Sequence, residues 1–144
     1  MPDDVIALLW ADDDSRGSLD PLGRRLQRNR FELQRAVDYS EATQLLKYRH
    51  FDSLLLDVIL PFAQGTGALT FDLGLQLAEE APSHCPTLRR IGILTVVQQQ
   101  EVSERYQRVA ELHAADHVTM EYFDKTRLLE PQALDRMMQF LRQK

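Results

Sequence analysis

The sequence predicts a doubly wound α/β domain built on a parallel sheet. Short apolar runs recur at residues 5–11, 31–37, 53–60, 91–97 and 118–120, and the first and third are nearly continuous. Such runs are typical of parallel strands that are covered on both faces. The segments between them carry apolar residues at helical spacing. Strand and helix therefore alternate five times, which favours a sheet with helices on both sides.

The helices are predicted from apolar stripes and end signals. The first helix is expected to use Ser18 as its cap with Pro21 in its first turn, the second to open at Ser40, and the third to stop at Pro82. The five stripes are Leu19, Leu22 and Leu26; Ala42, Leu45 and Leu46; Leu69, Leu73, Leu77 and Ala81; Val102, Tyr106, Val109 and His113; and, after Pro131, Leu134, Met137, Met138 and Leu141.

The composition indicates one globular domain over residues 1–144. Hydrophobic residues make up 44% of the chain and charged residues 27%, and the formal net charge is -5. That charge offers no basic field for nucleic acid or anionic lipid, and no apolar run is long enough to span a bilayer. The single cysteine, Cys85, excludes an internal disulfide. Since the N-terminus also lacks the pattern of a signal peptide, we expect a cytoplasmic protein with no direct nucleic-acid or membrane partner.

Carboxylates follow two of the predicted strands. Asp12, Asp13 and Asp14 come directly after the first apolar run, and Asp57 lies towards the end of the third. In open α/β sheets, ligands bind beyond the carboxyl ends of the strands. If the two strands are neighbours, these carboxylates face one another and repel unless a cation lies between them. The sequence therefore predicts a site for a divalent cation, most naturally Mg²⁺.

These pieces together resemble the receiver domains of bacterial two-component response regulators. The matching stretches are ADDD at 11–14, FDSLLLDVILP at 51–61 with Asp57 at the phosphoacceptor position, and ILT at 93–95 with Thr95 at the hydroxyl position. The resemblance extends over essentially the whole chain. It implies a flavodoxin-like (CheY-like) fold, a five-stranded parallel sheet in the order 2-1-3-4-5.

The resemblance also implies roles for the acidic residues. Asp57 would accept a phosphoryl group from a phosphohistidine on a sensor histidine kinase or a phosphotransfer protein. Asp13, Asp57 and the backbone carbonyl of Ile59 would hold Mg²⁺ directly, and Asp12 would act through water. The arginine cluster of the first helix is best explained as a solvated helix face, and the alternative is partner docking, because the family meets its kinases with this helix.

Four residues near the site bear on switching and hydrolysis. The Thr95 hydroxyl would bond a phosphoryl oxygen and shift when it arrives. Val96 is bulkier than the small residue usual at its position and would narrow access to the site. Ile59 and Val97 present apolar side chains that cannot orient a water, so slow hydrolysis of any acyl phosphate is expected.

The fifth strand is predicted to depart from the family pattern. Receiver domains have a lysine there, followed by proline. Aligning the Phe-Asp pair at 123–124 with the family's places Glu121 at the lysine position, Tyr122 at the proline position and Val118 at the switching-aromatic position. Using Lys125 as the lysine would break the match of the preceding residues, so Lys125 would have to reach in from the following loop. This alignment therefore predicts an atypical receiver domain.

The predicted function is a stand-alone response regulator receiver domain in phosphorelay signalling, with no enzymatic activity beyond slow autodephosphorylation. Its output is expected to pass to a downstream protein target, or through a homodimer, by way of residues 98–144. The alternative is a pseudo-receiver, a phosphorylation-independent interaction module, which Glu121, Tyr122 and Val118 favour. An aspartate-nucleophile phosphatase is disfavoured because its DxD motif is lacking, and a flavin site because no phosphate loop follows the first strand.

Three further patterns have plain explanations. His113 and His117 have a spacing that suggests zinc, but they straddle a helix-to-strand junction. The glycines at 65 and 67 lack the lysine of a phosphate-binding loop and are more simply an extension near the site. The interval from Asp57 to Thr95 is several residues longer than in the family, which places an insertion near 64–71 or 83–90.

Overall fold

The computed structural model describes residues 5–15, 17–63, 73–128 and 130–143. Its sheet has five parallel strands in the order β2-β1-β3-β4-β5, which confirms the predicted doubly wound topology. The strands are β1 (Ile6–Ala11), β2 (Phe31–Ala36), β3 (Ser53–Leu56), β4 (Arg90–Thr95) and β5 (Thr119–Asp124). The Gly65 and Gly67 extension predicted near the site lies outside the described residues.

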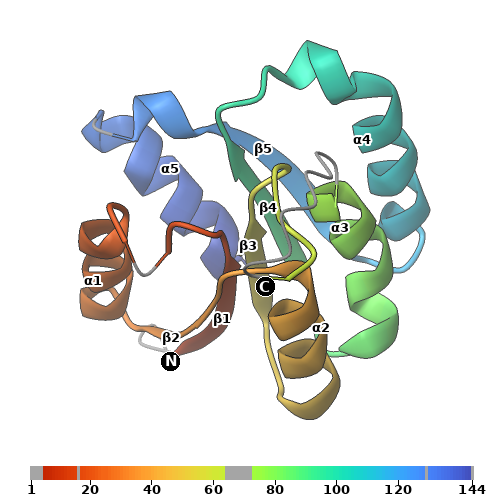
Figure 1. Cartoon of the computed structure of the whole chain (residues 1–144), viewed down its shortest axis with the longest axis horizontal. Helices are drawn as coiled ribbons and strands as arrows, with labels where there is room; N and C mark the ends of the chain where they lie inside the picture. The colour runs from red at the N-terminus through yellow and green to blue at the C-terminus, as the bar shows by residue number, and fades with distance from the viewer. Residues whose placement is uncertain (1–4, 16, 64–72, 129, 144) are drawn as a thin grey trace.

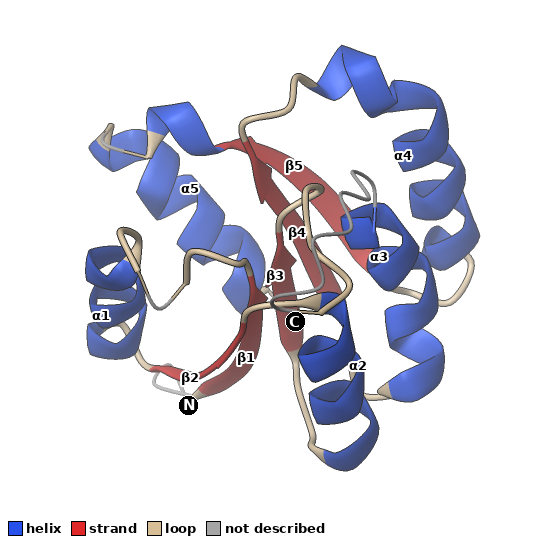
Figure 2. Ribbon diagram, viewed as in Figure 1, coloured by secondary structure: helices blue, strands red, loops and turns tan. Residues whose placement is uncertain are grey.

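The helices form a layer on each face of the sheet (Figures 1 and 2). In the described part of the chain they are α1 (Asp20–Arg28), α2 (Tyr39–Tyr48), α3 (Leu73–His84), α4 (Gln99–Ala114) and α5 (Pro131–Arg142), with a short 3-10 turn η1 (Lys125–Arg127). Helices α1 and α5 pack on one face, and α2, α3 and α4 pack on the other. None of the described helices combines the length and the apolar character needed to cross a membrane.

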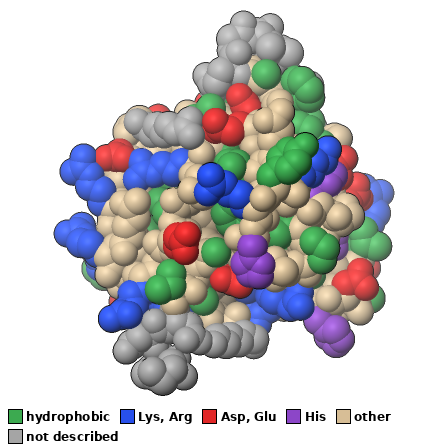
Figure 3. Space-filling view, turned by 90° about the horizontal axis from the view of Figure 1, so that it is seen from below, with side chains coloured by type: hydrophobic (Ala, Val, Ile, Leu, Met, Phe, Trp, Pro, Cys, Tyr) green, Lys and Arg blue, Asp and Glu red, His purple; other side chains and the backbone are tan. Residues whose placement is uncertain are grey.

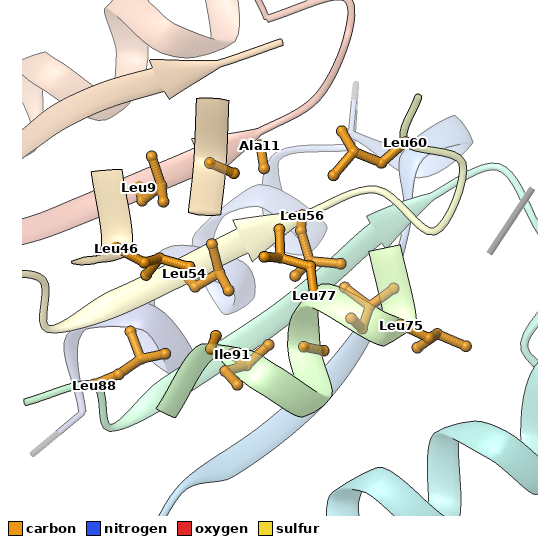
Figure 4. Packing of buried hydrophobic residues seen from close by; sticks show 14 of the residues in the cluster. Leu9, Ala11, Leu46, Leu54, Leu56, Leu60, Leu75, Leu77, Leu88 and Ile91 are labelled. Carbon is orange, nitrogen blue, oxygen red and sulfur yellow. The ribbon is translucent and has the colours of Figure 1, made fainter. Parts of the chain in front are cut away.

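In the described part of the chain, two hydrophobic clusters, one on each face, make up the core. Leu54 and Leu56 of β3 project towards α2, α3 and α4, and their cluster includes leucines of α2 and α3 (Figure 4). Leu55, between them in sequence, projects towards α1 and α5 and belongs to the same cluster as Trp10. All three leucines are fully buried, and each such side chain contributes about 1.5–3 kcal/mol through burial. The alternation along β3 therefore holds the two layers against one sheet.

The lone cysteine belongs to the cluster under α2, α3 and α4. Cys85 is buried just beyond the end of α3, with its sulfur 3.7 Å from the Phe51 carbonyl oxygen.

The surface seen in Figure 3 is chemically mixed. Basic, acidic and histidine side chains lie scattered among hydrophobic ones, and no single type covers that face.

Two helix starts differ from the sequence-based expectation. Asp38, and not Ser40, caps α2: its carboxylate accepts a bond from the Glu41 amide at 2.7 Å, while the Glu41 carboxylate accepts one from the Val37 amide at 2.9 Å. This reciprocal pair satisfies two amides at the helix start. Ser18 does not cap α1, which begins at Asp20; its hydroxyl bonds the Asp14 carboxylate instead.

Helix α3 continues through Pro82 to His84, so the predicted stop at Pro82 is wrong. A proline inside a helix has no amide to offer the carbonyl four residues earlier, which here is that of Ala78. His113 of α4 supplies the missing hydrogen-bond partner, because its buried ring nitrogen Nε2 lies 2.7 Å from the Ala78 oxygen. The histidine thereby joins α3 to α4 at the point where the proline interrupts the helical bonding.

Candidate functional site

The two aspartates predicted to converge do so at the carboxyl edge of the sheet. Strands β1 and β3 are neighbours, and Asp12 and Asp57 are the first residues beyond their respective ends. The Asp12 amide donates to Ala36 at 2.9 Å and the Asp57 amide to Ala11 at 3.1 Å, which extends the bonding of the sheet by one residue. Both carboxylates are buried, at 0% and 5% relative exposure.

A lysine lies between these carboxylates. The Nζ of Lys125 is 2.7 Å from Oδ2 of Asp12 and 2.6 Å from Oδ2 of Asp57. The position of Lys125 follows from the sheet register: Asp124, the last residue of β5, pairs with Thr95, the last residue of β4. Lys125 is therefore the first residue beyond the same edge, and its long side chain reaches across to β1 and β3.

This geometry corrects the alignment of the fifth strand. Glu121 pairs with Gly92, three residues before the edge, which is about 10 Å along a strand. Its carboxylate bonds the exposed Arg136 at 2.5 Å and does not face the aspartates. Val118 precedes β5 at the opposite edge of the sheet and is buried in the core. Lys125, four residues beyond Glu121, thus occupies the place that the sequence analysis had assigned to Glu121.

The same four-residue shift moves the aromatic position from Val118 to Tyr122. The Tyr122 hydroxyl donates to the Val97 carbonyl at 2.7 Å, and its ring packs edge-on against Tyr106 of α4 at 5.4 Å between centroids. Burial, with a contribution from the Asp57 charge, raises the pKa of Tyr122 to about 12. Tyr122 therefore remains a protonated donor at neutral pH and links the loop after β4 to α4.

Among the described residues, two donors hold the second oxygen of Asp57. The Thr95 hydroxyl donates to Oδ1 at 2.6 Å, and the Ile59 amide donates to it at 3.0 Å. Thr95 is fully buried, and its hydroxyl oxygen in turn accepts a bond from the Val97 amide at 3.3 Å. Val96 is exposed at the rim. Asp57 is thus oriented from three sides, by β4, by its own loop and by Lys125.

Helix α3 contacts the backbone of Asp57 directly. A Cβ atom built on Gly74 would lie 1.9 Å from the Asp57 carbonyl oxygen and 2.7 Å from Cα of Val58. The Gly74 amide also donates to the Val58 carbonyl at 3.1 Å. Only a residue without a side chain permits this approach, so Gly74 fixes the first turn of α3 against the backbone of Asp57.

Burial and charge act in opposite directions on the site. Burial raises the pKa of Asp12, and the hydrogen bonds from Lys125 and from the Asp14 amide offset this only in part. Burial would lower the pKa of Lys125, but its hydrogen bonds and ion pairs with Asp12 and Asp57 outweigh burial and raise it. The lysine is therefore held in its charged form by the two carboxylates it bridges.

The remaining acidic residues lie at the rim. Asp13 is exposed, and no group of three or more metal-binding side chains gathers in the part of the chain that the structure describes. Asp14 bonds the amide and hydroxyl of Ser18, which lowers the pKa of Asp14. Hence Asp12 and Asp57 meet as predicted, while Asp13 stands at the surface next to them.

Comparison with known proteins finds similar structures but no similar sequence. No protein-family model matches the chain, and no curated protein matches it. Chemotaxis response regulator CheY4 of Vibrio cholerae is 20% identical over 96% of this chain and 99% of its own, with a TM-score of 0.66. A response regulator from Thermotoga maritima is 16% identical over 96% and 100%, with a TM-score of 0.65.

A third similar structure was solved in a modified state. It is a response regulator protein from Burkholderia pseudomallei with a phosphorylated aspartic acid, a calcium ion and citrate. It is 20% identical over 93% of this chain and 72% of its own, with a TM-score of 0.58. Together with the strand order, these matches show that the chain has the CheY-like fold of response regulator receiver domains over nearly its full length.

Proposed function

We propose that this chain is a receiver domain that accepts a phosphoryl group on Asp57. The observation that carries the proposal is the set of contacts on that carboxylate: Lys125 on one oxygen, and Thr95 and the Ile59 amide on the other. A buried carboxylate at the carboxyl edge of a parallel sheet, with a cation and a hydroxyl aimed at it, is suited to phosphoryl transfer.

The proposed reaction moves one phosphoryl group. An oxygen of the Asp57 carboxylate attacks phosphorus, the P–N bond of a phosphohistidine on a partner kinase or phosphotransfer protein breaks, and the histidine nitrogen keeps the electron pair. The Lys125 ammonium, already beside Asp57, offsets the negative charge of the incoming group. The Thr95 hydroxyl exchanges its bond to Asp57 for one to a phosphoryl oxygen.

The donor set is compatible with Mg²⁺. The carboxylates of Asp12 and Asp57, which follow different strands, already converge on the Lys125 ammonium. Carboxylate oxygens are also the ligands that Mg²⁺ prefers. The residues that would hold the ion are Asp12, Asp57 and the exposed Asp13, with the Ile59 carbonyl. When bound, Mg²⁺ supplies charge neutralisation between the carboxylate and the phosphoryl group.

The read-out is proposed to run through the loop after β4. Thr95 bonds Asp57 and the Val97 amide, the Val97 carbonyl accepts from Tyr122, and Tyr122 packs on Tyr106 of α4. Through these contacts, movement of the Thr95 hydroxyl on phosphorylation shifts α4. Residues 98–144, which include α4, β5 and α5, remain the proposed face for a downstream protein or a second copy of the chain.

Acetyl phosphate tests the proposal directly. The protein is incubated with acetyl phosphate and Mg²⁺, and its intact mass is compared with that of Asp57→Asn. A gain of one phosphoryl group in the wild type alone supports phosphorylation of Asp57. No gain in the wild type contradicts it and favours the phosphorylation-independent interaction module, although Lys125 at the site removes the support that Glu121 had given this alternative.

A further inference from the structure

We infer that Arg35 of β2 is a positioning residue for the acidic loop that follows β1. The inference rests on the proposed function, because it concerns how that loop presents Asp12 and Asp13 to a divalent cation. Phe31 belongs to the core cluster under α1 and α5, Leu33 packs against it, and strand alternation places Arg35 on that same face. The charged side chain of Arg35 therefore lies at a position where strand alternation predicts an apolar side chain.

The guanidinium of Arg35 joins both sides of the turn into α1. Its Nη1 donates to the Ser15 carbonyl at 3.1 Å and to the carboxylate of Asp20, the first residue of α1. The side chain is only 17% exposed, and the bond from Arg35 lowers the pKa of Asp20. A largely buried guanidinium with these partners is a fixed support and not a solvated charge.

Helix α1 is built to accommodate this arginine. A Cβ atom on Gly23 would lie 2.2 Å from Nη2 of Arg35 and 2.7 Å from its Cζ. Gly23 is buried inside a helix, where glycine is about 1 kcal/mol less favourable than alanine. The guanidinium thus occupies the space that a side chain at position 23 would take.

The consequence falls on Asp13. The start of the acidic loop is fixed by the bond from the Asp12 amide to Ala36, and its far side is fixed at Ser15 by Arg35. Asp13 lies between these two anchors with its own side chain exposed. Its reach towards a cation shared with Asp12 and Asp57 is therefore set by the backbone that Arg35 holds.

The experiment measures Mg²⁺ affinity by titration calorimetry on the full chain. Arg35→Met is expected to weaken Mg²⁺ binding by about tenfold, the lower end for residues that support metal ligands. The rate of phosphorylation by acetyl phosphate at saturating Mg²⁺ is expected to stay close to that of the wild type. Arg35→Lys, which keeps the charge and donors, should recover part of the affinity.

Two further variants separate positioning from general stability. Arg24→Met is the matched control, because Arg24 also bonds Asp20 at 2.9 Å but is 70% exposed, and its Mg²⁺ affinity should equal that of the wild type. Gly23→Ala displaces the guanidinium without removing its charge and should also weaken Mg²⁺ binding. If circular dichroism shows that Arg35→Met is unfolded, Gly23→Ala is measured in its place.

The outcomes distinguish this inference from the proposed function. Wild-type affinity in the folded Arg35→Met or Gly23→Ala protein overturns the positioning role while leaving the receiver function intact. An equal loss in Arg24→Met overturns it as well, since a general charge effect would then suffice. Failure of the wild type to bind Mg²⁺ at millimolar concentration counts against the proposed function itself, and the inference falls with it.

Discussion

Among individual side chains, Lys125 governs the charge balance of the site. It is the cation between two buried carboxylates that would otherwise repel each other. Its own side chain is only 15% exposed, so water does little to screen the pair. Removal of one partner from such a buried group is costly because it leaves the others uncompensated.

The variant Lys125→Met is therefore expected to lower the free energy of unfolding by about 3 kcal/mol in the absence of Mg²⁺. The loss should shrink when Mg²⁺ is added, because a divalent cation can then neutralise Asp12 and Asp57. Urea denaturation with and without Mg²⁺ measures both effects, and acetyl phosphate should label the variant more slowly than the wild type.

Glu121→Gln is the matched control for the corrected alignment. Glu121 pairs with Arg136, whose side chain is 74% exposed, and exposed pairs contribute about 0–1 kcal/mol. The stability of the Glu121→Gln protein and its labelling by acetyl phosphate should stay near those of the wild type. A Glu121→Gln protein that behaved like Lys125→Met would show that Glu121, and not Lys125, acts at the site.

Gly74 supplies a second test at a single position. Alanine normally stabilises a helix relative to glycine by about 1 kcal/mol, but here its Cβ would overlap the Asp57 carbonyl. Gly74→Ala is expected to reduce the free energy of unfolding by about 1–3 kcal/mol, as overpacking does, and to slow phosphorylation, because the Asp57 backbone must shift. Chemical denaturation and the acetyl phosphate assay measure the two effects.

Gly92→Ala provides the comparison for that substitution. The nearest atom to a Cβ at Gly92 is the terminal Cδ1 of Leu55 at 3.1 Å, which a small side-chain adjustment can relieve. The loss of stability should be smaller than for Gly74→Ala and the phosphorylation rate unchanged. If both variants slowed phosphorylation equally, the close approach of α3 to Asp57 would not be the cause.

Among the helices, α3 and α4 are joined by the bond between His113 and the Ala78 carbonyl. Pro82 frees that carbonyl, and without His113 it would be buried and unpaired, at a cost of about 1–3 kcal/mol. His113→Leu should therefore be destabilising by that amount. In a Pro82→Ala background the restored amide can serve Ala78, so the same substitution should cost less.

A double-mutant cycle on urea midpoints measures this coupling. The four proteins are the wild type, His113→Leu, Pro82→Ala and the double variant. Additive free energies would mean that His113 contributes through its packing alone, and that the proline does not create the need for it.

For the domain as a whole, the tyrosines make stability depend on pH in the alkaline range. Burial raises the pKa of both Tyr106 and Tyr122 to about 12, from an ordinary value of 10.0. A group whose pKa is higher in the folded state contributes stability that is complete below its unfolded pKa. That contribution is lost as the pH rises through the folded value.

The urea midpoint is therefore expected to be insensitive to these groups up to about pH 10 and to fall between about pH 10 and 12. Ultraviolet absorbance of tyrosinate should show three of the chain's four tyrosines ionising late, because burial also raises the pKa of Tyr39. Tyr122→Phe should remove one late step and flatten the decline. Ionisation of all four tyrosines near pH 10 would contradict the burial of this pair.

The sequence was sufficient for the sheet and for part of the site. β1 and β3 are covered on both faces and so appear as apolar runs, and Asp12 and Asp57 follow their ends. Strand β5 is at the sheet edge and mostly half-exposed, so its pattern does not mark where it ends. Because the end of β5 is uncertain from the sequence, the alignment placed the lysine position at Glu121. The register of β5 against β4 is needed to identify Lys125.

Arg35 was missed for a related reason. An arginine in a strand normally indicates a solvent-facing position, and the sequence does not reveal that α1 crosses above it with a glycine in the contact. Likewise, Pro82 is a common stop signal, and the sequence does not reveal that His113 of α4 bonds the carbonyl that the proline leaves free. Long-range partners, which lie far away in sequence, decide each of these cases.

The burial of Cys85 offers a practical route to watching the domain respond. Because the chain's one thiol is shielded beneath α2, α3 and α4, maleimide dyes should leave the native protein unlabelled. A cysteine introduced at the exposed Val96 could then carry a fluorophore alone, directly beside Thr95. Its emission would report in real time whether acyl phosphate chemistry at the neighbouring carboxylate rearranges this loop.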